Sequence, residues 1–255
     1  MKCMVINLDR STDRLVNITS EFARIGVSFQ RIAAVDARSD PVNFPALPHL
    51  TKPEIACFLS HRKCWQIIAG GADEYAAIFE DDAVLTNDGG QLFSNDQWVP
   101  RDADIVKLET MFGRVRLGRI VSVSNGHAVG RLVGEHLGTA GYVISKGTAQ
   151  RLLHQLKHLK EPIDLTLFSP NSWTFAISKI YQLVPAMCVQ SQRLVGKKAV
   201  ITLIQAAPHR PKNVATKIRG ELLRFFAHCR NGTFWGTEKV DLRWEGEREP
   251  AKWSK

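Results

Sequence analysis

Short apolar runs alternate along this chain with longer segments whose apolar residues recur every three or four positions. The short runs predict strands, and the longer segments predict helices. We expect strands over 3–8, 27–35, 76–79, 105–108, 138–145 and 180–184. We expect helices over 11–25, 52–68 and 146–157, a short one from 162, and a hairpin arm over 115–123 that turns at Ser124-Asn125-Gly126. This alternation indicates an α/β fold with a mostly parallel sheet flanked by helices.

The charge of the chain is unevenly distributed. Its 255 residues carry a net charge of +9, but residues 1–192 hold 20 Lys or Arg against 19 acids. Residues 193–230 hold nine Lys or Arg against one acid, and the last 25 residues hold five basic and five acidic residues. We therefore expect a folded domain over 1–192 and a basic, helical C-terminal extension over 193–255, where an anionic partner would bind.

Composition favours a soluble protein of a reducing compartment. Hydrophobic residues make up 44% and charged residues 23%, and no apolar run approaches the roughly 20 residues of a membrane span. The apolar stretch within residues 1–10 is too short for a signal peptide. Five cysteines, an odd and unpaired set, argue against a disulfide framework, so we expect a cytoplasmic location.

The stretch with the clearest chemistry is Ala76-Ala77-Ile78-Phe79-Glu80-Asp81-Asp82-Ala83. An apolar run typical of a buried strand ends in three carboxylates, at the strand end where open α/β sheets place their ligands. A divalent cation, Mn²⁺ or Mg²⁺, would relieve their mutual repulsion and could hold a diphosphate. A solvated acidic turn explains the tripeptide equally well.

Several other motifs are excluded or disfavoured. No G-x-G-x-x-G is present, and Gly113-Arg114-Val115-Arg116-Leu117-Gly118-Arg119-Ile120 lacks the lysine and hydroxyl of a P-loop, so it is interpreted as a basic hairpin. Cys57, His61 and Cys64 share one helical face, but no fourth zinc ligand suggests itself. A packed helix face is the better interpretation.

Five blocks in order resemble the glycosyltransferase family 25 proteins, which include lipooligosaccharide β-galactosyltransferases and the related collagen galactosyltransferases. The blocks cover roughly residues 4–190: Val5-Ile6-Asn7-Leu8-Asp9-Arg10 with Asp13-Arg14, Glu54-Ile55-Ala56-Cys57-Phe58-Leu59-Ser60-His61 with Trp65, Ile78-Phe79-Glu80-Asp81-Asp82-Ala83, Gly138-Thr139-Ala140-Gly141-Tyr142-Val143-Ile144-Ser145, and Pro162-Ile163-Asp164. Ala56 stands where the family usually has glycine, and the sequence around Asp164 is looser than the pattern.

The resemblance implies a GT-A fold, a nucleotide-sugar donor and an inverting transfer, most often from UDP-galactose. Asp82 is then the first candidate for metal coordination, with Asp81 or Glu80 sharing the metal or the sugar hydroxyls. The proton acceptor would be Asp164 or His61, although Ser60 and His61 could instead orient the diphosphate. Two groups of residues would line the donor site. Asn7, Asp9 and Arg14 would contact the nucleotide, and Thr139, Gly141 and Tyr142 would contact the sugar.

The basic segment has its own pattern. Apolar residues recur at helical spacing among cationic ones: Ile218, Leu222, Phe225 and Phe226 among Lys217, Arg219, Arg224 and Arg230. Such a helix over 212–230 would suit an anionic membrane surface, where a lipid-linked oligosaccharide acceptor is extended at the inner face of the bacterial inner membrane. The alternative is a helix packed on the core. Nucleic-acid binding is disfavoured because no recognition motif accompanies the charge.

Two further functions fit parts of the sequence. A metal-dependent phosphoryl or nucleotidyl transferase also needs clustered acids. A non-enzymatic basic module that binds membranes or nucleic acid would need only the C-terminal segment. The leading hypothesis remains a UDP-sugar-dependent hexosyltransferase, because only that hypothesis uses all five blocks.

Overall fold

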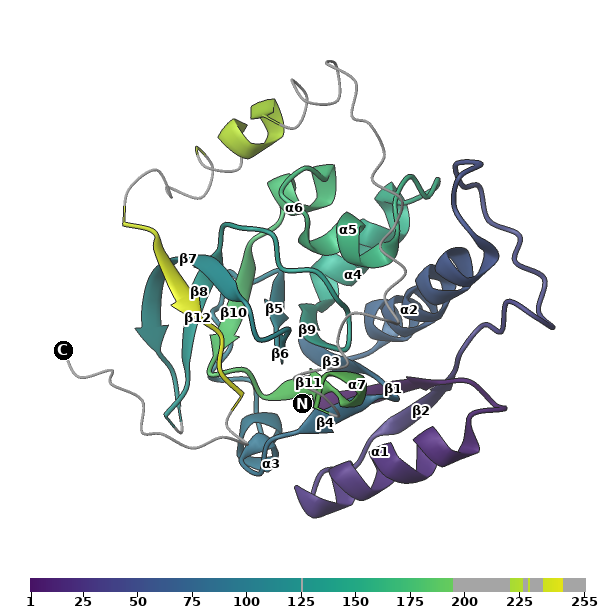
Figure 1. The fold of residues 1–255 in the computed structure, drawn as a ribbon, viewed down its shortest axis with the longest axis horizontal. Helices are drawn as coiled ribbons and strands as arrows, with labels where there is room; N and C mark the ends of the chain where they lie inside the picture. The colour runs from purple at the N-terminus through teal and green to yellow at the C-terminus, as the bar shows by residue number, and fades with distance from the viewer. Residues whose placement is uncertain (125, 195–220, 227–228, 230–235, 245–255) are drawn as a thin grey trace.

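The computed structural model describes residues 1–124, 126–194, 221–226, 229 and 236–244, which form a large central sheet with helices on both faces (Figure 1). In chain order the strands of this sheet are β1 (Lys2–Asn7), β2 (Gln30–Ala33), β3 (Tyr75–Glu80), β5 (Ile105–Lys107), β7 (Arg114–Ser122), β8 (Ala128–Leu132), β9 (Gly141–Ser145), β10 (Ile180–Val184) and β12 (Glu238–Asp241). Across the sheet their order is β12-β7-β8-β10-β5-β9-β3-β1-β2.

Most strands of this sheet run in one direction. The pairs β1–β2, β1–β3 and β5–β10 are parallel, whereas β9 is antiparallel to both β3 and β5. The remaining pairs, β8–β10, β7–β8 and β7–β12, are antiparallel. Six of the nine strands (β1, β2, β3, β5, β7 and β10) therefore share a direction, which confirms the predicted α/β class.

The helices form where the sequence supplies a start signal and an apolar stripe. They are α1 (Thr12–Arg24), α2 (Lys52–Gly70), α3 (Gly89–Phe93), α4 (Lys146–Gln155), α5 (Ile163–Phe168), α6 (Trp173–Ile177) and α7 (Ser191–Leu194). In α2, Thr51 and Glu54 form a reciprocal capping box, and Pro53 occupies the first turn. Helix α1 is followed by Gly26, whose φ of 67° few residues other than glycine adopt.

Each face of the sheet carries its own core. Because side chains alternate along a strand, Met4 and Ile78 point toward the face covered by α2, α4 and α5. Val5 and Phe79 point toward the opposite face, which α1 and α3 cover. Both cores end at the carboxyl ends of β1 and β3, where polar residues take over and the candidate site begins.

Tertiary pairing adds elements that the sequence did not predict. A second sheet of three very short strands joins β4 (Ala83–Leu85), β11 (Cys188–Gln190) and β6 (Glu109–Thr110). Strand β12 pairs with β7, and the Thr110 hydroxyl donates to the carbonyl of Leu242 at 2.8 Å. Residues 236–244, which the prediction places in the C-terminal extension, thus pair with the main sheet.

The predicted basic helix is described only in part. Residues 221–226 are helical, whereas 195–220, 227–228 and 230 lie outside the described residues. Within the described part of the chain, no helix has the length and apolar character needed to cross a membrane.

Candidate active site

The three consecutive acids at the end of β3 point into three different environments. β3 ends at Glu80, and β4 begins at Ala83, so the intervening turn carries Asp81 and Asp82. The backbone amide of Ser191, at the start of α7, donates to the carbonyl of Asp82 at 2.8 Å and fixes this turn. A short turn anchored at both ends places the three carboxyl groups close together with different neighbours.

Asp81 faces the end of β1. The side-chain amide of Asn7 donates to one carboxylate oxygen at 2.7 Å, and the Arg14 guanidinium donates to the other at 3.1 Å. Arg31 Nε donates to Asn7 Oδ1 at 2.9 Å, which fixes the Asn7 amide as the donor to Asp81, and Arg31 also pairs with Asp9. The structure thus brings together all three residues predicted to bind the nucleotide, with Arg14 still half-exposed.

Asp82 is the least satisfied of the three acids. Its Oδ1 atom is buried and has no hydrogen-bond partner among the described residues. Burial, followed by repulsion from Glu80, raises the pKa of the Asp82 carboxyl to about 7, although Arg14 opposes this shift. A buried oxygen ligand without a donor, beside two further carboxylates, fits a hard divalent cation.

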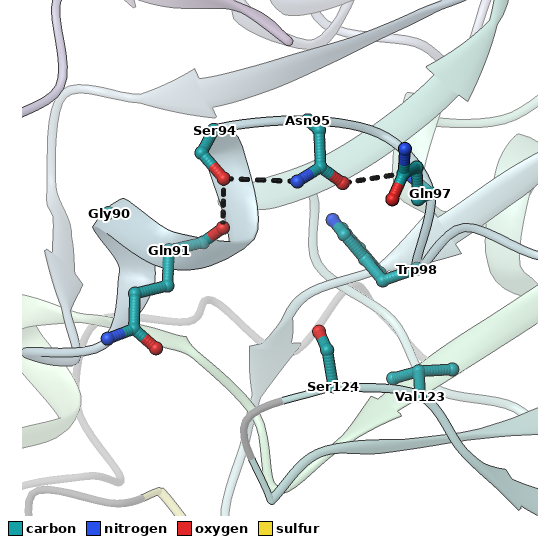
Figure 2. Close-up of a pocket in the computed structure, with 8 residues that line it drawn as sticks. All are labelled: Gly90, Gln91, Ser94, Asn95, Gln97, Trp98, Val123 and Ser124. Carbon is teal, nitrogen blue, oxygen red and sulfur yellow. Dashed lines mark hydrogen bonds between the residues drawn. The ribbon is translucent and has the colours of Figure 1, made fainter.

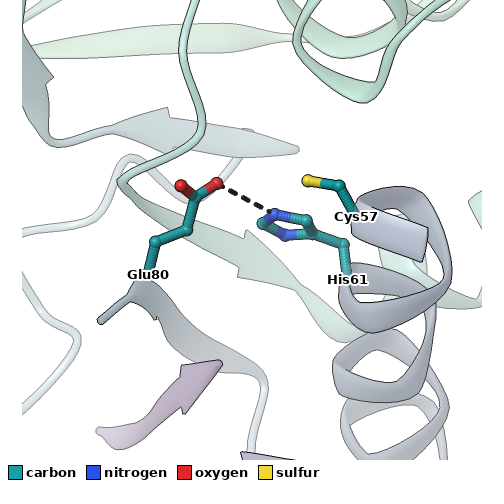
Figure 3. Close-up of side chains that lie close together, drawn as sticks. All are labelled: Cys57, His61 and Glu80. Atoms are coloured by element: carbon teal, nitrogen blue, oxygen red, sulfur yellow. Dashed lines mark hydrogen bonds and ion pairs between the residues drawn. The ribbon is translucent and has the colours of Figure 1, made fainter. Parts of the chain in front are cut away.

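Glu80 faces α2. Its carboxylate accepts a hydrogen bond from the Thr139 hydroxyl at 2.5 Å and lies 3.3 Å from His61 Nε2 (Figure 3). Burial opposes ionisation of Glu80, but the hydrogen bonds from His61 and Thr139 lower the pKa of its carboxyl. Glu80 therefore stays ionised and oriented.

A directed chain of hydrogen bonds runs from α2 through the sheet to Glu80. Trp65 Nε1, which can only donate, lies 3.0 Å from the Tyr142 hydroxyl, and this hydroxyl lies 2.9 Å from His61 Nδ1. The Glu80 carboxylate can only accept, so it accepts from Nε2–H, and this tautomer leaves Nδ1 to accept a hydrogen bond from the Tyr142 hydroxyl. Both ring nitrogens are thus engaged, and His61 is only 1% exposed.

Several residues predicted to contact the donor are buried and engaged within the protein. Ser60 and His61 lie in the middle of α2 rather than at a helix start, and the Ser60 hydroxyl donates to Ala56 and accepts from the Val35 amide. The space beside Gly141 is filled by Cys188 and Phe79. Tyr142 is 0% exposed. Ser60 thus ties α2 to the end of β2, Gly141 allows close packing, and Tyr142 orients His61.

Asp164 lies in the first turn of α5 and is brought to the same region. Its Oδ1 atom accepts from the amide of Leu165 at 2.8 Å, and the side chain is half-buried. The Cys57 thiol has a pKa raised well above its usual value, first by burial and then by Glu80, Asp164 and Asp82. The electrostatic field of three predicted site residues therefore acts on this one thiol of α2.

Sequence inspection missed a buried ion pair beneath the site. Lys107, at the end of β5, is fully buried, and its Nζ lies 3.6 Å from Glu109 Oε1 and 4.1 Å from the centre of the Phe168 ring. Burial lowers the pKa of Lys107 and raises that of Glu109. The available signal was a lysine inside the apolar run Ile105-Val106-Lys107-Leu108.

A separate cavity of about 830 Å³ lies away from these acids (Figure 2). It is lined by residues of α3, the segment after it and the end of the β7 arm: Gly90, Gln91, Ser94, Asn95, Gln97, Trp98, Val123 and Ser124. None of the predicted site residues contributes to it, and the Trp98 indole is turned inward to donate to the Leu92 carbonyl at 2.7 Å. The cavity is therefore not part of the candidate active site.

The chain matches a known protein family. The family model described as glycosyltransferase family 25 (LPS biosynthesis protein) matches residues 1–167, which include every predicted site residue. The chain belongs to glycosyltransferase family 25. It is therefore a glycosyltransferase, and its nucleotide-sugar donor and saccharide acceptor follow from that reaction class.

Curated relatives cover most of the chain. The lacto-N-neotetraose biosynthesis glycosyltransferase LgtB of Neisseria gonorrhoeae is 32% identical over 209 residues, which is 74% of each chain. LgtE of the same organism is also 32% identical, over 213 residues and 74% of each chain. The lipooligosaccharide biosynthesis protein lic2B of Haemophilus influenzae is 30% identical over 211 residues, or 76% of this chain and 77% of that protein.

Proposed function

We propose that this family 25 enzyme transfers galactose from UDP-galactose, with inversion, to a saccharide acceptor in lipooligosaccharide biosynthesis. The relatives LgtB, LgtE and lic2B are named for lacto-N-neotetraose or lipooligosaccharide biosynthesis, which supports this acceptor class. The observation that carries the proposal is the buried, unpartnered oxygen of Asp82, beside Asp81 and Glu80 at the carboxyl end of β3.

The donor half of the site would be held by Asp82 and Asp81 with Mn²⁺ or Mg²⁺. The bound cation would neutralise charge on the leaving diphosphate. Asp81 has both oxygens engaged by Asn7 and Arg14, so Asp82 supplies the free ligand and Asp81 positions the turn. Arg14, half-exposed beside the acids, is suited to a phosphate oxygen of the donor.

Asp164 is the better supported proton acceptor. In a single displacement, the acceptor oxygen bonds to C1 of the sugar, the C1–O bond to the diphosphate breaks, and UDP leaves with that bonding pair. The acceptor hydroxyl proton passes to a base within hydrogen-bond reach. Asp164 is partly exposed and acts on the same Cys57 thiol as Glu80 and Asp82, whereas both nitrogens of the buried His61 are occupied. We therefore assign His61 to the positioning of Glu80.

We also propose that the C-terminal segment contacts an anionic membrane surface at the inner face of the bacterial inner membrane. In residues 221–226, Leu223 packs on Ala176, and Phe226 stacks on Trp173 with ring centres 6.2 Å apart. Leu222 and Phe225 remain 64% and 61% exposed. Exposed apolar side chains within a segment of net charge +8 suit an interfacial helix.

The test of the proposed function is turnover by the purified protein with UDP-galactose, Mn²⁺ and a saccharide acceptor. We expect acceptor-dependent release of UDP and a β-linked product. Asp82→Asn should lower kcat/KM at least about 100-fold, whereas Asp73→Asn, at an exposed position, should not change it. Release of a sugar phosphate instead of UDP would identify a phosphoryl or nucleotidyl transferase. Failure with every common UDP-sugar would refute the proposal.

The test of the base is the pH dependence of the same reaction. Asp164→Asn should lower kcat about 100-fold or more and remove the acidic limb of the pH profile, with little change in KM for the donor. If the limb persists in Asp164→Asn and disappears in His61→Gln, then His61 is the base.

A further inference from the structure

Cys57, His61 and Glu80 converge on one point beside the proposed donor site. Their ligand atoms, the thiol sulfur, a ring nitrogen and a carboxylate oxygen, all lie within 4.8 Å of one another. Figure 3 shows the Cys57 thiol and the His61 ring on adjacent turns of α2, with the Glu80 carboxylate facing the ring from β3. Sulfur, imidazole and carboxylate together form a ligand set typical of zinc.

We propose that Cys57, His61 and Glu80 form a second metal site, which binds Zn²⁺ or a similar borderline-soft cation and inhibits the enzyme. The site is separate from the free carboxylate ligand that Asp82 offers to Mn²⁺ or Mg²⁺. Because thiolate and imidazole ligands favour zinc over these hard cations, the two sites differ in selectivity. The inhibitory role, though not the binding itself, rests on the proposed function.

The geometry is close to that of a bound tetrahedral ion. With bonds of about 2.0–2.1 Å, nitrogen and oxygen ligands of one zinc lie about 3.3 Å apart. His61 Nε2 and Glu80 Oε1 are already 3.3 Å apart. The ring is held by the Tyr142 hydroxyl, which Trp65 in turn fixes, so a small side-chain movement of Cys57 would complete the triangle. A fixed ring lowers the entropic cost of binding.

The protons balance on binding. The Cys57 thiol loses its proton to solvent as the sulfur–metal bond forms. The proton on His61 Nε2 moves to Nδ1, where the Tyr142 oxygen can accept it, and leaves the Nε2 lone pair for the metal. The fourth position would be taken by a water molecule, as at zinc sites with three protein ligands.

Binding would alter the site without competing for Mn²⁺. The ion would replace the hydrogen bond between His61 and Glu80 and hold the Glu80 carboxylate away from Thr139, which now donates to the same oxygen. We therefore expect zinc to inhibit transfer even at saturating Mn²⁺, mainly by lowering kcat.

Cobalt provides a direct probe of binding in the intact chain without donor or acceptor. Addition of Co²⁺ to the reduced protein should produce a thiolate-to-cobalt charge-transfer band and the visible bands of a tetrahedral ion. Zn²⁺ should displace both. Cys57→Ala should lose the charge-transfer band, whereas Cys229→Ala, at the exposed cysteine, should retain it. Absence of the band from the unaltered protein would refute the site, whether or not the protein transfers galactose.

Two further measurements cover inhibition and folding. Cys57→Ala, which removes no residue of the proposed catalytic machinery, should transfer galactose normally and need at least about tenfold more zinc for half-inhibition. Equal zinc sensitivity in both proteins would overturn the inhibitory role. If Cys57→Ala does not fold, zinc protection of Cys57 from iodoacetamide, mapped by peptide mass spectrometry in the unaltered protein, tests the same contact. Absence of protection would refute it.

Discussion

Replacing Tyr142 by phenylalanine tests the hydrogen-bond chain that holds His61. The ring is fully buried, so the change removes one hydroxyl and leaves the packing in place. Two buried groups lose their partner: Trp65 Nε1–H, now 3.0 Å from the hydroxyl, and His61 Nδ1, now 2.9 Å from it. An unsatisfied buried polar group costs about 1–3 kcal/mol, so we expect a loss of about 2–6 kcal/mol of unfolding free energy.

Tyr181→Phe is the matched control. The Tyr181 hydroxyl donates to Asp102 at 2.9 Å and accepts from Arg131. The Asp102 side chain is 50% exposed, so water can replace this partner, and Arg131 keeps its contact with the face of the ring. We expect less than about 1 kcal/mol for this control. Urea unfolding of both variants, followed by tryptophan fluorescence and circular dichroism, measures the difference. If the two variants lose the same stability within about 0.5 kcal/mol, the chain does not carry the energy assigned to it.

Two further predictions concern packing and pH. Gly141→Ala should cost about 1–3 kcal/mol of stability because its methyl group would overlap Cys188, whereas Gly147→Ala, which meets no atom within 4 Å in α4, should gain about 0.4–1 kcal/mol; thermal unfolding of both variants checks the signs. Partial burial opposes ionisation of Asp88, but the hydrogen bond from His127 lowers the pKa of its carboxyl to about 2 from 3.8. The free energy of unfolding that the ionised Asp88 contributes is complete above pH 3.8 and is lost as the pH falls toward 2. The difference in unfolding free energy between the unaltered protein and Asp88→Asn should therefore shrink by about 2 kcal/mol between pH 5 and pH 2. An unchanged difference would contradict this account.

The elements that the sequence predicted are those with a strong local signal. β1 and β3 are apolar runs of strand length, and α2 begins at a threonine with proline and glutamate behind it. The acids after β3 were expected at the carboxyl end of a buried strand and are found there. In contrast, β4, β6 and β11 have two or three residues each, and only pairing between distant segments makes them strands.

The Cys57 cluster shows why helix periodicity alone was insufficient. Cys57, His61 and Cys64 do share one face of α2, as predicted, but seven residues advance a helix by about 10 Å. Cys64 therefore lies further along α2 and is fully buried in the core, whereas Cys57 lies beside Glu80. The third ligand, Glu80, comes from β3, which only the tertiary fold brings to this helix.

The roles within the motifs depend on directed hydrogen bonds that no spacing rule contains. A buried histidine beside a carboxylate suggests a general base until the proton on each nitrogen is assigned. Trp65 Nε1–H can only donate, and the Tyr142 oxygen accepts from it. The Tyr142 hydroxyl in turn donates a hydrogen bond to His61 Nδ1, and His61 Nε2–H donates to Glu80. His61 therefore has no free lone pair for an acceptor hydroxyl. Under the proposed function the proton of that hydroxyl would pass to a carboxylate, and Asp164 is the partly exposed one that α5 supplies.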